Sequence, residues 1–360
     1  MSVLASYLTR LLLARFALLL FGLAALLLGL DLMVNANSLL RGEGGLEALA
    51  RYGFLRTPMV VSDLIKVASL LAGLITFAGL IRHSELTAIW GAGVSQGGLF
   101  RHLLPIAALL GGLQFVVDDL AVPASADALT EWGVGEYRNE QMTSSGKEFT
   151  WIHAGTDVVR LRTAGIGAAS LSGFTIFQRD DEGNLLARLD VDSAQWEDGR
   201  WLLSGVTITG GDGSTPRVEA TREWDISLNP DSLDHLSTHP RHLSFEQTRR
   251  FAGGDGQGTW APYLYRTWLY EKLTACLVPL LMLLVSAALA QQTQRHGHVE
   301  LLFLFGAAIG FAFFIFNGIT LAMGEVGLLP PLFATTVPLV VVAAVAGSVI
   351  YWHELKRRPA

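Results

Sequence analysis

Residues 11–30 read LLLARFALLLFGLAALLLGL, an apolar run that carries a single charge, Arg15. A helix needs about 20 apolar residues to cross the hydrocarbon core of a bilayer. Lipid offers no hydrogen-bonding partner to an irregular backbone, so a run of this kind must be helical. The run therefore predicts a membrane-spanning helix and sets the class of the whole protein.

Five similar runs follow it, and the resulting six spans form two groups of three around a polar middle region. Hydrophobic residues make up 51% of the 360 residues, and the mean hydropathy of +0.40 is too apolar for an ordinary soluble domain. After span one (Leu11–Leu30), the predicted spans are Pro58–Ile81, Leu99–Leu120, Thr267–Ala290, Leu301–Met323 and Leu332–Trp352.

Lys and Arg in the short loops predict how the spans are oriented, because these residues collect on the cytoplasmic side. The predicted inner side holds Arg10, Arg82, Arg101, Arg295, Lys356, Arg357 and Arg358, whereas the loop after span one holds Arg41, Arg51 and Arg56. Six spans then place both termini inside and the middle region outside.

The middle region alternates apolar and polar residues, as in FTWIHAG and DVVRLRT, which is the two-residue period of half-buried strands. Turns are predicted at Asp181-Glu182-Gly183-Asn184 and at Asp198-Gly199. Short strands at close spacing favour a sandwich or an open jelly roll. The predicted domains are residues 1–121 with a short helix near 84–95, the β domain 122–262, and residues 263–360.

Several kinds of chemistry are absent from the sequence. The net charge of -6 argues against a nucleic-acid partner. The sequence contains no phosphate-binding loop motif, so we do not expect this chain itself to bind ATP. The histidines of QRHGHVE (294–300), together with Glu300, are interpreted as a solvated loop because they are too few for a metal site. We therefore predict no catalytic residue, metal or cofactor, and no enzyme activity in this chain.

Charged residues within the spans are costly in lipid, and they are candidates for function. Asp63 and Lys66 lie three residues apart on one face of span two, where they either pair with each other or line a polar cavity. Arg15 is expected to reach the inner surface, and Glu271 and Lys272 are expected to anchor the outer end of span four.

The segment RHSELTAIWGAGVS (82–95) separates spans two and three. Ser84 can cap a helix that begins near Glu85, and Leu86, Ile89, Trp90 and Val94 then share a face toward the lipid or the spans. The residues alone favour an interfacial helix, although the carboxylate of Glu85 could also make a charged contact with a partner.

The plan of six spans around an outer strand domain resembles the LptF/LptG (YjgP/YjgQ) family of lipopolysaccharide-export permeases. RHSELTAIWGAGVS is similar to the segment that follows span two in that family, and FTWIHAGTDVVRL is similar to the first strands of its outer jelly roll. YLYRTWLYEKLTACLVPLLMLLVSAAL looks like its fourth span, and MGEVGLLPPLFATTVPLVV looks like its turn between the last two spans. The last match favours the LptG branch.

The resemblance implies a non-hydrolytic permease of the bacterial inner membrane, with a periplasmic jelly roll. It implies pairing with a second, LptF-like permease and with a dimer of a separate LptB-like ATPase. Lipopolysaccharide would leave the surrounding membrane lipids, enter between the permeases, and pass to a bridge of further jelly rolls. A single-span LptC-like partner would insert beside a gate formed by spans one and five.

Particular residues take roles by this resemblance. Glu85 would belong to a coupling helix that docks on the ATPase, and the coupling residues would be Ser84, Glu85, Leu86, Ile89, Trp90 and Gly93. The family often places basic residues at the outer end of span one, but this chain has Asp31 in that neighbourhood. Lipid phosphates would therefore meet Arg41, Lys66 or the partner permease, or the cargo would be less anionic.

In the β domain, the apolar strand residues include Phe149, Trp151, Phe174 and Ile176, which either hold acyl chains or form the domain core. Two other functions stay open at this stage. One is a membrane-anchored sensor or scaffold, in which Glu85 would be dispensable. The other is a membrane enzyme acting on lipid, which would need a catalytic cluster that the sequence does not supply.

Overall fold

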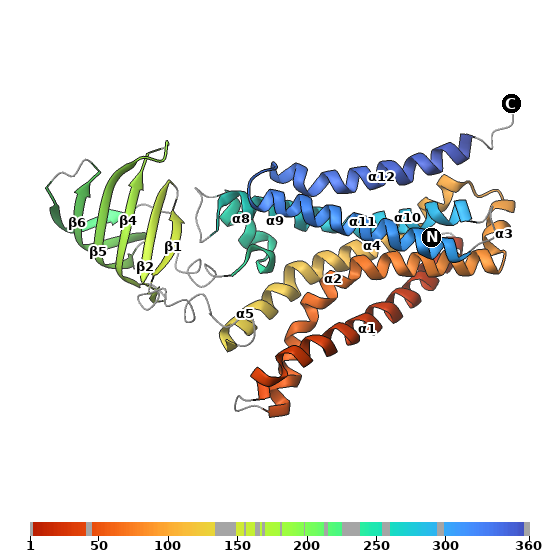
Figure 1. Cartoon of the computed structure of the whole chain (residues 1–360), viewed down its shortest axis with the longest axis horizontal. Coiled ribbons are helices and arrows are strands. Elements are labelled where there is room, and N and C mark those ends of the chain that lie inside the picture. The colour runs from red at the N-terminus through yellow and green to blue at the C-terminus, as the bar shows by residue number, and fades with distance from the viewer. Residues whose placement is uncertain are drawn as a thin grey trace. The chain divides into compact units, whose positions relative to one another are not determined.

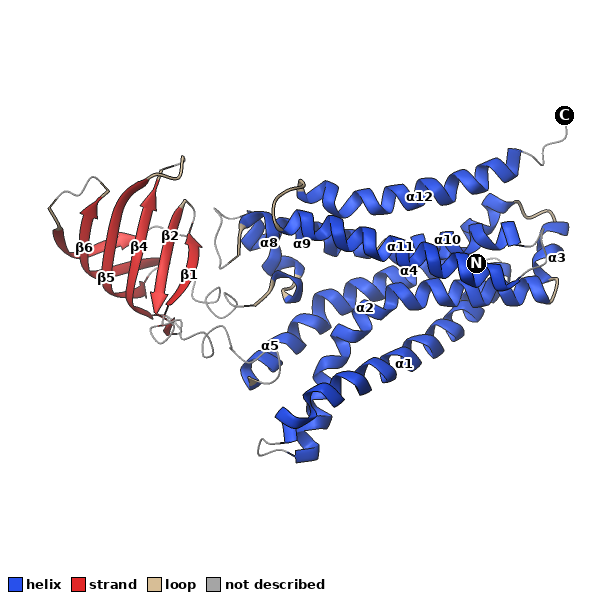
Figure 2. Cartoon of the chain, in the orientation of Figure 1, coloured by secondary structure: helices blue, strands red, loops and turns tan. Residues whose placement is uncertain are grey.

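The computed structural model divides the chain into two compact units, Met1–Leu129 with Tyr270–Ala360, and Thr130–Leu269. The first is helical, and the second contains the sheet (Figures 1 and 2). The structure describes residues 3–40, 45–133, 149–154, 156–162, 166–167, 170–180, 182–197, 199–211, 215–224, 238–253, 260–293 and 299–355.

The long helices follow the apolar runs of the sequence. Five described stretches are long and apolar enough to cross a membrane, and a bent pair of helices makes a sixth span if it is counted as one. The helices of this unit are α1 (Val3–Leu40), α2 (Gly45–Arg82), α3 (Glu85–Gly91), α4 (Gln96–Val116), a π-helix (Val117–Ala121), α5 (Val122–Trp132), α9 (Pro262–Ala275), α10 (Val278–Thr293), α11 (Val299–Glu325) and α12 (Pro331–Leu355).

The fourth span is broken, although the sequence predicted one continuous helix over Thr267–Ala290. Helices α9 and α10 meet at an angle of 49°. Pro279, near the start of α10, has no N–H to donate and its ring clashes with the carbonyl four residues earlier, at Ala275. The helix therefore ends at Ala275 and begins again at Val278.

Helix α2 is the centre of the helical unit. About 67% of its most apolar window is buried, against 22% for α1. Gly306 and Gly310 of α11 lie over Leu74 and Leu70 of α2, with no room for a larger side chain. The hydrophobic effect does not drive helices together in lipid, so close van der Waals packing at small residues such as these holds α11 against α2.

Among the described residues, the sheet has seven antiparallel strands in the order β1-β2-β4-β5-β6-β7, with β3 paired to β4. Most paired strands follow one another in the chain, and the exception is the pair β2 and β4, which are separated by β3. The strands are β1 (Phe149–Ala154), β2 (Asp157–Arg162), β3 (Ile166–Gly167), β4 (Ser170–Arg179), β5 (Leu185–Glu197), β6 (Arg200–Gly210) and β7 (Arg217–Trp224). A 3-10 turn (Pro240–His242) and α8 (Phe245–Gly253) follow the sheet in the chain.

The predicted hairpin turns lie between β4 and β5 and between β5 and β6. Gly183 and Gly199 have φ angles of 88° and 83°, the left-handed conformation that favours glycine. Membrane-length helices with an inserted β domain confirm the predicted fold class, and the sheet is consistent with the expected jelly roll.

Candidate functional site

Helix α3 occupies the segment between α2 and α4 that the sequence singled out. Ser84 stands at its N-cap position, but the Ser84 side chain makes no capping hydrogen bond. The backbone of Ser84 is left-handed, with φ 58°, whereas a capping side chain needs an extended backbone. Ser95 has that conformation and accepts a bond from the backbone N–H of Gly98 at 2.9 Å. The predicted cap at Ser84 is therefore wrong, and Ser95 caps the next helix.

The apolar residues of α3 attach it to the helical unit. Leu86 is fully buried in the core that α1, α2, α4 and α10 form. Trp90 packs against the same core, and Ile89 is half-buried. Gly93, just after the helix, has a φ of 86° that turns the chain toward α4. The sequence allowed this apolar face to turn toward the lipid or toward the spans. The burial of Leu86 in the core shows that it turns toward the spans.

Glu85 has a partner that sequence reasoning missed. The hydroxyl of Tyr7, at the start of α1, donates a hydrogen bond of 2.6 Å to Oε2 of Glu85. The two residues are 78 positions apart in the chain. No pattern in the sequence connects them, because the contact depends on how α1 packs beside α3.

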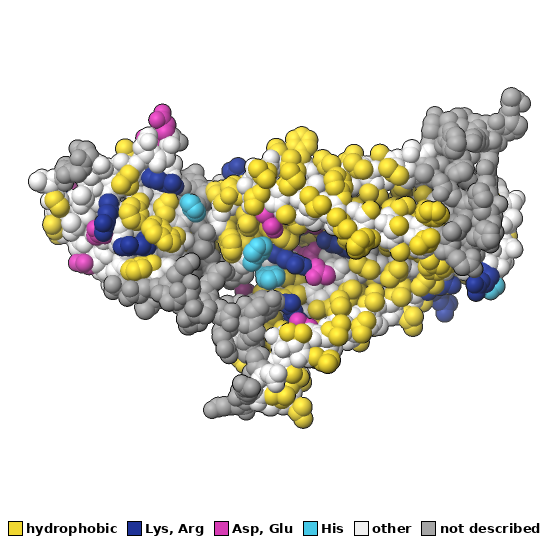
Figure 3. Space-filling view, in the orientation of Figure 1, with side chains coloured by type: hydrophobic (Ala, Val, Ile, Leu, Met, Phe, Trp, Pro, Cys, Tyr) yellow, Lys and Arg dark blue, Asp and Glu magenta, His cyan; other side chains and the backbone are white. Residues whose placement is uncertain are grey.

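A second group of polar side chains lies inside the helical unit, and we call it the polar cluster. Its members come from three spans and are Ser62, Lys66, Gln114, Asp118, Glu271 and Lys272. Figure 3 shows hydrophobic side chains over most of the visible face of this unit, with one group of charged side chains within that face and another at one end.

An ion pair joins α2 to α9 in the polar cluster. Nζ of Lys66 lies 3.3 Å from Oε1 of Glu271, and the two side chains are 20% and 8% exposed. Asp63, three residues before Lys66, also acts electrostatically on this ammonium group. Glu271 and Lys272 are buried among the helices, so their predicted role as anchors at the outer surface is wrong.

Asp118 joins α2, α4 and α9 from within the π-helix. Its carboxylate accepts hydrogen bonds from the hydroxyl of Ser62 and, at 2.7 Å, from the side-chain amide of Gln114. Its backbone carbonyl accepts a bond of 3.2 Å from Nζ of Lys272. A π-helix alters the backbone ladder and frequently marks a functional position.

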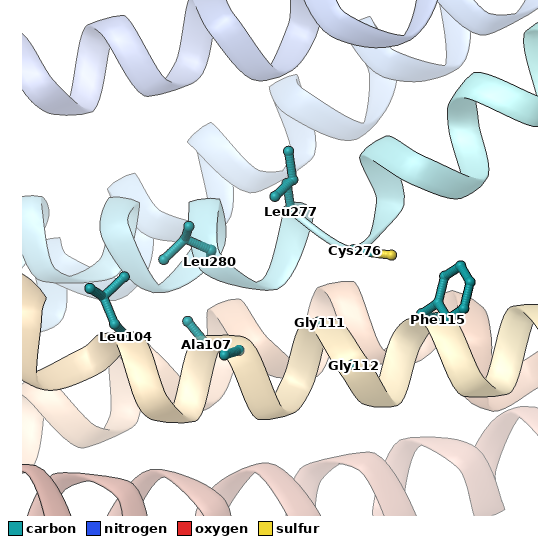
Figure 4. A pocket seen from close by; sticks show the side chains of 9 residues that line it. Leu104, Ala107, Gly111, Gly112, Phe115, Cys276, Leu277 and Leu280 are labelled. Carbon is teal, nitrogen blue, oxygen red and sulfur yellow. The ribbon is translucent and has the colours of Figure 1, made fainter. Parts of the chain in front are cut away.

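The break in span four lies directly against α4. Gly111 faces the carbonyl oxygen of Cys276, and a side chain at position 111 would overlap that oxygen. An apolar cavity of about 500 Å³ opens beside this contact (Figure 4). It is lined by Leu104, Ala107, Ala108, Gly111, Gly112, Phe115, Cys276, Leu277 and Leu280.

Arg15 also differs from its predicted position. Its Nη1 donates a hydrogen bond of 2.8 Å to the backbone carbonyl of Ile75 on α2. Gly79, one turn further along, leaves room for the guanidinium group. Arg15 therefore crosses between α1 and α2 instead of reaching the surface, because the backbone of α2 supplies an acceptor nearby.

The C-terminal part of α1 carries an acid that is also paired. Nε of Arg56 on α2 lies 3.6 Å from Oδ2 of Asp31 on α1. Arg41, the other candidate for binding lipid phosphate, lies outside the described residues, as do His296 and His298. Among the described residues, no three His, Cys, Asp or Glu side chains gather to hold a metal ion.

The sheet separates the four predicted lipid residues onto two faces. Phe174 and Ile176 belong to the core, with exposed fractions of 3% and 0%. Phe149 and Trp151 lie on the opposite face, where Trp151 stacks on Phe177 with 5.7 Å between ring centroids. The guanidinium group of Arg160 lies 4.5 Å from the centre of the Phe149 ring.

Comparison with known proteins places these features in a family. The family described as "Lipopolysaccharide export system permease LptF/LptG" matches residues 6–352, nearly the whole chain. The chain belongs to the LptF/LptG family. The resemblance noted in the sequence is thereby confirmed, and residues 6–352 include both the α3 segment and the polar cluster.

Two curated relatives are LptG permeases of the lipopolysaccharide export system. The protein from Haemophilus influenzae is 20% identical over 317 residues, which cover 84% of this chain and 84% of the relative. The protein from Escherichia coli strain K12 is 22% identical over 317 residues, covering 82% and 84% respectively. These relatives agree with the expected LptG branch, and the chain is a multi-pass membrane protein of a permease family.

Within this LptF/LptG chain, the structure brings together some predicted residues and separates others. The residues expected to couple to an ATPase lie in or directly beside helix α3, whereas Lys66 lies far along α2 from it and pairs with Glu271. Sequence reasoning missed Tyr7, Ser62 and Gln114. The last two could have been found, because a polar side chain inside an apolar run is itself a signal.

Proposed function

We propose that this chain is one permease of a pair in the bacterial inner membrane, and that an ATP-driven machine uses the pair to extract lipopolysaccharide. Family membership supports the cargo and the permease role. The observation that carries the ATP-driven part is α3, a short helix held at the end of the helical unit with an acid in its first turn. ATP hydrolysis belongs to a separate LptB-like ATPase dimer.

The contact with the ATPase is made by α3. Ionised Glu85 accepts a charge-assisted hydrogen bond from a basic residue of the partner. Leu86, Ile89 and Trp90 hold the helix against the spans, so that a push on α3 reaches them. Ser84 and Gly93 set the direction of the helix through their left-handed backbones.

Lysine 66 is the proposed contact for a phosphate group of the lipid, together with Arg41. The Lys66 side chain as a whole is 20% exposed, and its ammonium group is held by the ion pair with Glu271. A phosphate that approaches it must compete with Glu271 or share the cation with it. Because a carboxylate already balances part of this charge, we expect the site to favour strongly anionic head groups.

The partner permease and an LptC-like single span are proposed to meet the apolar faces of α1 and α11. Both helices have apolar windows that are only 22% buried within this chain. Their exposed side chains include Leu18, Phe21, Leu26 and Leu30 of α1 and Phe303, Phe305, Phe311 and Ile319 of α11. Surfaces of this composition suit either lipid or another helix.

Lipid passes from these spans to the periplasmic sheet and then to a bridge of further jelly rolls. The exposed Trp151 and its neighbour Phe149 offer an apolar face. Phe174 and Ile176 are already packed, so acyl chains could reach them only if the core opened. We therefore place first contact of the cargo at Trp151 and later contact at the core.

Affinity purification of the tagged protein in mild detergent tests this function. We expect an ATPase and a second permease to accompany the wild type, and the ATPase to be lost from Glu85→Ala. Glu47→Ala is a matched control, because Glu47 is an exposed acid in the first turn of α2. Should the wild type purify alone, the sensor or scaffold alternative replaces transport.

A further inference from the structure

We infer that Tyr7 is a positioning residue for the ATPase contact and that it connects α3 mechanically to α1. The inference rests on the proposed role of Glu85 and extends it to a second helix. Its basis is the hydrogen bond of 2.6 Å between the Tyr7 hydroxyl and Oε2 of Glu85.

The hydrogen bond leaves the carboxylate able to act. A carboxylate has two oxygens and can accept bonds on both. Tyr7 occupies Oε2, and no described residue hydrogen-bonds to Oε1 of Glu85. Tyr7 therefore fixes the direction of the acid while Oε1 is left for a cationic group of the ATPase.

Helix α3 needs a second fixed point. It has only seven residues, and Ser84 and Gly93 turn the chain at its two ends with φ angles of 58° and 86°. Leu86 and Trp90 hold the apolar face of the helix against the core, but neither of them fixes the direction of the Glu85 carboxylate. The bond between Tyr7 and Glu85 supplies the second point and so sets that direction.

Helix α1 is suited to carry movement away from this point. Leu8, next to Tyr7, begins a row of buried side chains spaced four residues apart that continues through Leu12, Phe16, Leu20 and Ala24. Beyond Ala24 the helix presents exposed Leu26, Leu30 and Met33. The helix is unbroken from Val3 to Leu40, so a displacement at Tyr7 reaches the exposed part.

The test compares Tyr7→Phe with the wild type in the purified complex, reconstituted in proteoliposomes that contain lipopolysaccharide. The substitution keeps the ring and removes only the hydroxyl. We measure ATP hydrolysed and lipopolysaccharide released, and we take their ratio. We expect the ATPase to stay bound while the lipid released per ATP falls by a factor of about 3 to 10, the size expected for one solvent-exposed hydrogen bond.

Two further variants separate coupling from general damage. Tyr263→Phe removes an exposed tyrosine hydroxyl from α9 and should leave the ratio unchanged. If Tyr7 acts through Glu85, adding Tyr7→Phe to Glu85→Gln should reduce the ratio no further than Glu85→Gln alone. Additive losses, an unchanged ratio in Tyr7→Phe, or a parallel fall in both rates would each overturn the inference.

Failure of the proposed function gives a different result. In that case the wild-type preparation contains no ATPase, or it hydrolyses ATP without releasing lipopolysaccharide. A wild type that exports lipid, together with a Tyr7→Phe variant of normal ratio, rejects the role of Tyr7 alone.

Discussion

The α3 segment and the polar cluster both connect helices of the helical unit, but they do so through different kinds of contact. Helix α3 is held by the buried Leu86, by Trp90 packed against the same core, and by one exposed hydrogen bond. The polar cluster joins α2, α4 and α9 through an ion pair and several hydrogen bonds, most of them shielded from solvent. A partner can therefore move the first region at little cost, whereas the second holds three spans as one block.

The largest expected effect comes from breaking the ion pair of the polar cluster. Lys66→Ala leaves Glu271 buried without its cation, which should destabilise the helical unit by about 3 kcal/mol. Thermal unfolding in detergent can be followed through the reaction of Cys276, the single cysteine, with a thiol-specific dye.

The charge-swapped variant Lys66→Glu/Glu271→Lys separates structure from lipid binding. It restores an ion pair, so most of the lost stability should return. Lipid crosslinking near position 66 should stay low, because the cation has moved to α9. If crosslinking returns along with stability, Lys66 is a structural partner of Glu271 and contacts no phosphate.

A smaller loss is expected where α4 meets the break of span four. Gly111→Ala forces a methyl group against the Cys276 carbonyl, so the helices must separate. We expect a cost of about 1–3 kcal/mol, the usual range for overpacking. Gly112→Ala is the control, since nothing lies within 4 Å of its added carbon. Equal unfolding temperatures for the two variants would show that the contact is loose.

At the α3 end, substitutions of Ser84 should have little effect on stability. Ser84→Gly removes a side chain from a left-handed position and should stabilise α3 by about 0.5 kcal/mol, after the entropy of glycine is counted. Ser84→Ala should cost almost nothing, because no capping bond is lost. A loss near 1 kcal/mol in Ser84→Ala, measured by the same dye assay, would mean that the hydroxyl caps the helix after all.

The smallest effect concerns the turn between β4 and β5. Hydrogen bonds from the side chain and backbone of Asn184 hold the pKa of Asp180 below its ordinary value. The stabilisation is therefore present above the ordinary aspartate pKa, near 4, and is lost as pH falls through the lowered value. Asp180→Asn should unfold at a slightly lower temperature than the wild type at pH 7, and this difference should shrink in acid.

The sequence was most informative where an interaction is local or repeated. Apolar runs placed the spans, and the turns around Gly183 and Gly199 follow from residue types that accept a left-handed backbone. The partners of Glu85 and Lys66 could not be predicted, because each lies on another helix and depends on how the helices pack. The break in span four was not predicted, because the run was assigned from its apolar composition. Pro279 within that run was the residue that could have indicated it.

The separation of Lys66 from Glu271 has a consequence for biosynthesis. The two residues are 205 positions apart, and a ribosome adds about 5–20 residues per second. About 10–40 s therefore pass between the synthesis of Lys66 and that of Glu271. The antiparallel sheet, whose paired strands lie close together in the chain, can fold during that interval. During that interval the acids near the Lys66 ammonium group are Asp63 and Asp118, which the first three spans supply themselves, so Glu271 completes a site whose charge is already partly balanced.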